Sequence, residues 1–84
     1  MDRKTVADRI GAYLRNEITL ARLVDWAERA MMDDAFEEKD MDVIRTVVAR
    51  LGLADVRDFG LTWDDCAEML RRLGYTARIE IVAA

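Results

Sequence analysis

The sequence predicts a compact, mainly α-helical domain of four helices followed by a single C-terminal β-strand. Three observations lead to this class. Apolar residues recur at helical spacing through residues 3–73, threonine or glycine marks most of the segment ends, and the apolar period changes to two after Gly74. With 84 residues, 52% of them hydrophobic, the chain has enough apolar surface for one small core. We therefore treat residues 1–84 as one domain.

Two amphipathic helices are predicted in the first half of the chain. The first covers residues 3–15, and the second begins at the N-cap Thr19 and fades near residue 33. Ile18 and Leu23 lie on either side of this cap and can form a hydrophobic staple. The positions expected to be buried in these two helices are Val6, Ile10, Tyr13, Leu14, Leu20, Leu23, Val24, Ala27, Ala30 and Met31.

Two further helices are predicted in the second half. The third starts between residues 34 and 42 and ends just before Gly52, and the fourth lies between Thr62 and Gly74. Thr62 and Asp65 have the spacing of a capping box, with aspartate in place of the preferred glutamate. The positions expected to be buried are Ile44, Val47, Val48, Leu51, Trp63, Cys66, Ala67, Leu70 and Leu73.

The last segment differs from the helices in its period. Apolar and polar residues alternate after Gly74, which predicts a strand at about residues 75–82. Because the N–H and C=O groups of a strand must be hydrogen-bonded, the strand needs a neighbour. Three neighbours are possible: the segment Leu53–Phe59 in a small ribbon, the same strand of a second copy in a homodimer, or a strand of a different protein.

Composition excludes several kinds of chemistry. The chain has no histidine and no serine, so it has no serine nucleophile and no histidine acid, base or metal ligand. Nothing distinguishes a pair among its 17 acidic residues. We therefore expect no enzymatic activity, no catalytic residue, no cofactor and no metal site. Cys66 is the one cysteine of the sequence and cannot form an internal disulfide, which fits a protein of the reducing cytoplasm. We expect Cys66 to be a buried structural thiol. The longest uncharged stretch has five residues, too few to span a membrane.

The net charge of −4 comes from one segment. Residues 31–42 contain six acids and one lysine, whereas the rest of the chain is nearly neutral. These acids do not have the spacing of a calcium loop, since Ala35 and Glu38 occupy its third and sixth positions. They suit either a solvated helix start or a surface that docks a basic partner. No long basic run is present, so nucleic-acid binding is not expected.

Three functions follow from these features. The first is a non-enzymatic protein-binding module of the inhibitor, immunity or adaptor type, which docks a partner through the acidic segment 31–42 and the edge of strand 75–82. The second is a structural or regulatory protein that dimerises through this strand. The third, less favoured, is a helix-turn-helix DNA binder. In size and charge alone the chain is similar to small acidic bacterial immunity proteins and antitoxins. The residues expected to contact a partner are Trp26, Asp33, Asp34, Phe36, Glu37, Glu38, Tyr75, Arg78 and Glu80. Of the two tryptophans, we expect Trp26 to be the more exposed.

Overall fold

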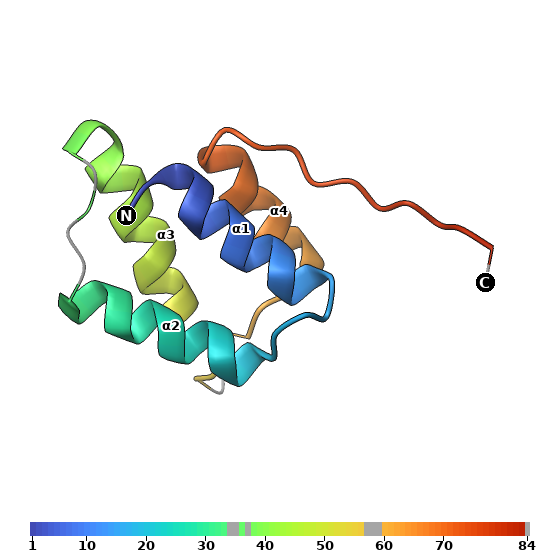
Figure 1. Ribbon diagram of the computed structural model, residues 1–84, viewed down its shortest axis with the longest axis horizontal. Coiled ribbons are helices and arrows are strands. Elements are labelled where there is room, and N and C mark those ends of the chain that lie inside the picture. Colours follow the sequence, from blue (N-terminus) through green and yellow to red (C-terminus); the bar gives the residue numbers. More distant parts are fainter. Residues whose placement is uncertain (34–35, 37, 57–59, 84) are drawn as a thin grey trace.

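A computed structural model describes residues 1–33, 36, 38–56 and 60–83. Within these residues the chain forms four α-helices, α1 (Arg3–Leu14), α2 (Leu20–Asp33), α3 (Met41–Gly52) and α4 (Trp63–Arg72), and a short 3₁₀ helix, η1 (Glu38–Asp40), immediately before α3 (Figure 1). The mainly helical class and the four predicted helices are therefore confirmed.

The core lies between the four helices. Helices α2 and α3 make the most extensive contact, and α1 contacts each of the other three. The buried residues of this core are Val6, Ala7, Ile10, Leu23, Ala27, Ala30, Ile44, Val47, Val48, Leu51, Cys66, Met69, Leu70 and Leu73. Two predicted core positions are wrong, because Met31 is 39% exposed and Trp63 is 37% exposed. Both lie at a helix end, where the neighbouring helices no longer cover the apolar stripe.

Two helices end in the same hydrogen-bonded motif. After α1, Asn16 has a φ of 61° and the N–H of Glu17 donates to Ala12 O at 2.8 Å. After α4, Gly74 has a φ of 92° and the N–H of Tyr75 donates to Leu70 O at 2.8 Å. These are Schellman ends, in which a residue in the left-handed region turns the chain back over the last helical turn. The predicted end of the fourth helix at Gly74 is confirmed, whereas α3 ends one residue later than predicted and includes Gly52 itself.

Side chains cap the starts of three helices. The Thr62 hydroxyl accepts from the N–H of Asp65 at 3.1 Å, and the Thr62 N–H donates to the Asp65 carboxylate at 2.9 Å. This confirms the capping box. The Thr19 hydroxyl accepts from the N–H of Arg22 at 3.2 Å, as expected of an N-cap. The Asp2 carboxylate caps α1 by accepting from the N–H of Thr5 at 2.8 Å, a cap that the sequence analysis did not identify.

The C-terminal segment, residues 75–83, follows α4, and its far end projects away from the bundle (Figure 1). Its backbone forms no helix or strand in the described part of the chain, and beyond Tyr75 no backbone hydrogen bond to another described residue is present. Of the segment Leu53–Phe59, the described residues 53–56 form turns and do not pair with it, and residues 57–59 lie outside the described residues. The C-terminal strand therefore stays a prediction.

Candidate functional site

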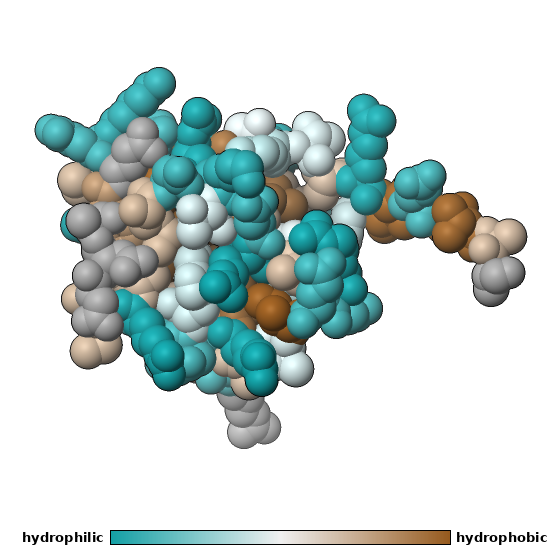
Figure 2. All heavy atoms as spheres, viewed as in Figure 1, coloured by the Kyte–Doolittle hydropathy of each residue, from teal (hydrophilic) through white to brown (hydrophobic). Residues whose placement is uncertain are grey.

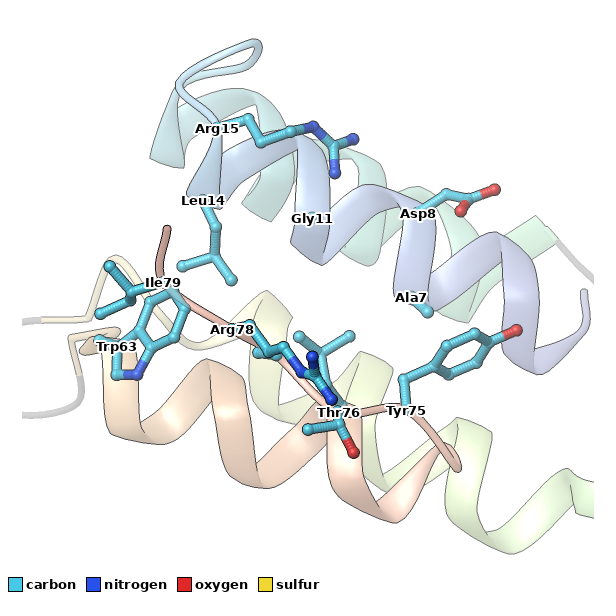
Figure 3. A pocket seen from close by; sticks show the side chains of 12 residues that line it. Ala7, Asp8, Gly11, Leu14, Arg15, Trp63, Tyr75, Thr76, Arg78 and Ile79 are labelled. Atoms are coloured by element: carbon cyan, nitrogen blue, oxygen red, sulfur yellow. The ribbon is translucent and has the colours of Figure 1, made fainter. Parts of the chain in front are cut away.

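The candidate site combines the C-terminal segment with a groove between α1 and α4. The chain reverses at Gly74, so that residues 75–79 run back along α4, opposite α1 (Figure 3). The space between the segment and the two helices has a volume of about 510 Å³. The groove is lined from α1 by Ala7, Asp8, Gly11 and Leu14, from α4 by Trp63 and Leu70, and otherwise by Arg15 and residues 75–79.

The segment is anchored at its beginning and free at its end. The Tyr75 N–H is held by the Schellman end of α4, and Ala77 is half-buried and packs against the core. Exposure then rises: Ile79 is 68% exposed, Ile81 92% and Val82 74%. We call the exposed end of the segment, residues 79–83, the arm. Figure 2 shows its apolar residues as brown spheres that project from a mostly polar surface. A row of exposed β-branched side chains is typical of a surface that contacts another molecule, so this arm is the strongest candidate for a binding site among the described residues.

Both faces of the segment contribute to the groove, since the polar Thr76 and Arg78 line it as well as the apolar Ala77 and Ile79. Ile79 lies beside Trp63 at one end of the groove, and both residues line it (Figure 3). The charged residues Arg78 and Glu80 alternate with the apolar ones along the chain and are exposed. Tyr75, Arg78 and Glu80, predicted to contact a partner, therefore belong to one extended segment. Trp63 was missed as a candidate, although its place at the start of α4 could have indicated an exposed helix end.

The acidic segment forms a second and separate region. Of its predicted contact residues, the side chain of Asp33 and both Asp34 and Glu37 lie outside the described residues. Glu38 is exposed in η1, at the opposite end of the molecule from the projecting arm (Figure 1). Phe36 is partly buried against the core, and the Arg45 guanidinium lies 5.8 Å from the centre of its ring. The structure thus does not bring the acidic segment and the C-terminal segment into one surface.

Trp26 is not the more exposed of the two tryptophans, contrary to the expectation from the sequence. It is partly buried against the core, and the guanidinium of Arg9 in α1 lies 5.4 Å from the centre of its ring. Such a cation–π contact covers the ring with a side chain of the same molecule. The more exposed tryptophan is Trp63, at 37%. This correction arises because α1 crosses the edge of the α2 stripe, which a single-helix pattern cannot show.

The described residues offer little for catalysis or metal binding. Cys66 is fully buried, and its burial raises the pKa of the thiol to about 11, so the reactive thiolate is disfavoured. No group of three or more Cys, Asp or Glu side chains close enough to hold a metal ion occurs in the part of the chain that the structure describes. The same residues contain no helix that is both long and apolar enough to cross a membrane.

Comparison of the chain with known protein families, curated proteins and solved structures finds no match.

Proposed function

We propose that this chain is a protein-binding module that contacts its partner by adding the segment 75–83 as a β-strand. One observation carries the proposal: the end of this segment projects from the bundle with Ile81 92% exposed. Strand addition supplies what such a segment needs. The partner strand satisfies the N–H and C=O groups of the backbone, and the alternate side chains are covered on one face.

The bundle supports this role by presenting the segment in a fixed direction. The left-handed conformation of Gly74 and the hydrogen bond from Tyr75 to Leu70 orient the chain as it leaves α4, and the packing of Ala77 holds the next residues against the core. Because the first half of the segment is already ordered in the single chain, the entropy cost of binding is lower. Only the outer residues remain to be ordered by the partner.

The acidic segment, residues 31–42, is not part of the proposed strand contact. Its described residues 38–40 lie at the opposite end of the bundle from the arm (Figure 1). Asp40 is engaged within the chain, because its carboxylate lies 3.1 Å from the Arg3 guanidinium. We therefore treat the docking of a basic partner on residues 31–42 as a separate hypothesis, tested in the same experiment.

Site-specific photo-crosslinking in cells of the native host tests the proposal. A photoreactive amino acid replaces Ile81 on the arm, the exposed Met32 in the acidic segment, or the exposed Arg22 of α2 as the control. We expect adducts to a protein chain from position 81 and none from position 22. Adducts from position 32 alone would instead favour the acidic surface, and the absence of protein adducts at position 81 contradicts the proposal.

A further inference from the structure

We infer that the partner of the segment 75–83 is the same segment of a second copy, paired antiparallel with Ile79 at the centre. The inference rests on the proposed function and names the partner. It is carried by the sequence of residues 77–81, Ala-Arg-Ile-Glu-Ile, in which a cation and an anion stand on either side of an isoleucine. Such a stretch is complementary in charge to its own reversed copy.

The register follows from the geometry of an antiparallel pair. Two residues directly opposite each other point to the same face of the ribbon. With Ile79 opposite Ile79 of the second copy, Arg78 lies opposite Glu80, and Glu80 lies opposite Arg78. One face then carries two cross-strand ion pairs. The other face carries the two central isoleucines opposite each other. On either side of them, an Ala77 of one copy lies opposite an Ile81 of the other.

The other two-fold registers are worse. Centring the pair on Arg78 places two guanidinium groups opposite each other, and centring it on Glu80 does the same with two carboxylates. Shifting the pairing by one residue gives up the two-fold symmetry, places charged side chains opposite isoleucines and mixes the two faces. Only the register centred on Ile79 keeps both the charge pairing and the separation of the apolar face.

The groove between α1 and α4 provides a cover for the apolar face. Ala77 packs against the core, and its neighbours Thr76 and Arg78 line the same groove, so the segment lies along the groove at this point. In the proposed register, Ile81 of the second copy lies opposite Ala77 and therefore next to this groove. The groove has a volume of about 510 Å³ and is lined partly by Leu14 and Trp63. The side chain that is 92% exposed in the single chain thus comes next to a groove where apolar Leu14 and Trp63 lie together with charged Asp8 and Arg15.

A charge-exchange cycle on the full chain tests the register. Dimerisation is measured by light scattering and sedimentation equilibrium over a concentration series. Arg78→Glu places carboxylates opposite each other, and Glu80→Arg places guanidinium groups opposite each other. Because each substitution alters two symmetry-related pairs, we expect the dimer to dissociate about tenfold more readily in either single variant. The double variant Arg78→Glu/Glu80→Arg restores opposite charges and is expected to dimerise within about twofold of the original chain.

The matched control uses an exposed ion pair within one helix. Asp25 and Arg29 of α2 lie 3.2 Å apart and far along the chain from the segment. Arg29→Glu and Asp25→Arg change the net charge by the same amounts as the test variants. We expect neither control to change the dissociation of the dimer. Equal effects of control and test variants would mean that net charge governs association, which overturns the inference.

Disulfide trapping tests independently which residues lie opposite each other. Ile79→Cys places two thiols opposite each other at the two-fold axis, and mild oxidation should join the copies covalently. In Ile81→Cys the two thiols are separated by about 13 Å along the ribbon, beyond the reach of a disulfide. Both positions lie outside the bundle, and the buried Cys66 is common to all variants, so the unaltered chain serves as the blank.

The outcomes separate this inference from the proposed function. A dimer with rescue by the double variant and selective trapping at position 79 supports both. A monomer at all concentrations, or trapping at position 81 as readily as at 79, overturns the inference. If the chain is a monomer and position 81 still crosslinks to a different protein, the proposed function stands with a foreign partner. If it is a monomer and no protein adducts form at position 81, both are wrong.

Discussion

Helix α3 and the C-terminal segment contain similar β-branched side chains in opposite surroundings. Ile44 of α3 has no exposed surface, whereas Ile81 is 92% exposed. In a helix the backbone hydrogen bonds are internal, so only the side chains need neighbours, and three other helices supply them. A strand needs another strand for its backbone and a cover for its side chains. The first region thus buries such a residue within one chain, and the proposed strand addition would cover it with another chain in the second.

The largest expected effect is on stability, and it tests the difference between the two regions directly. Ile44→Ala should lower the free energy of unfolding by about 2–5 kcal/mol, because it removes buried methyl groups and leaves a cavity. Ile81→Ala should change it by less than about 0.5 kcal/mol, because its side chain has almost no contacts in the single chain. Urea denaturation followed by circular dichroism, at concentrations where the chain is monomeric, measures both.

A small domain can lose its fold on such a core substitution, so Ile44→Val provides a milder step. It should cost about 0.5–1.5 kcal/mol and keep the transition measurable. If Ile81→Ala destabilised the monomer as much as Ile44→Val, the C-terminal segment would pack on its own bundle, and the need for a partner would disappear.

The next effect concerns the turn that joins the two regions. Gly74 has a φ of 92°, in the left-handed region where an added Cβ is strained. Gly74→Ala should therefore destabilise the chain by about 1–2 kcal/mol, and the Cβ would also lie 3.1 Å from the Arg3 guanidinium. Thermal and urea unfolding measure the loss.

Asn16 gives the matched control, because it has a φ of 61° in the equivalent position after α1. Asn16→Gly relieves the cost of a side chain in this conformation and should be neutral or slightly stabilising. Should Gly74→Ala be as neutral as Asn16→Gly, the direction in which the segment leaves α4 would not be fixed by this turn.

The helical part of the fold was predictable because its signals are local. Thr62 and Asp65 lie three residues apart and Gly74 follows Leu73, the apolar C-cap residue of α4, so cap and end could be located from spacing alone. The errors arise where burial depends on a second helix. Trp26 is covered by Arg9 of α1, and Trp63 is left at the edge of a groove, and neither contact is encoded in the period of one helix.

The candidate site was predictable in part for the same reason. The alternation of residues 75–82 identified Tyr75, Arg78 and Glu80 as one extended segment, because period two is a local property. The groove that meets this segment combines α1 with α4, which are separated by about half of the chain, so no spacing rule could indicate it. The distance between the acidic segment and the arm is likewise a consequence of helix packing (Figure 1).

The smallest expected effect is a pH dependence that belongs to the helical region and not to the arm. Hydrogen bonds from the backbone and side chain of Thr62 lower the pKa of Asp65 below its ordinary value of 3.8. A carboxyl group whose pKa is lower in the folded state stabilises the fold above its unfolded pKa, and this contribution is lost as the pH falls through the folded pKa. The unfolding free energy of the unaltered chain should therefore decline below about pH 4 more steeply than that of Asp65→Asn. Equal declines in the unaltered chain and in Asp65→Asn would contradict this role of the Asp65 carboxylate.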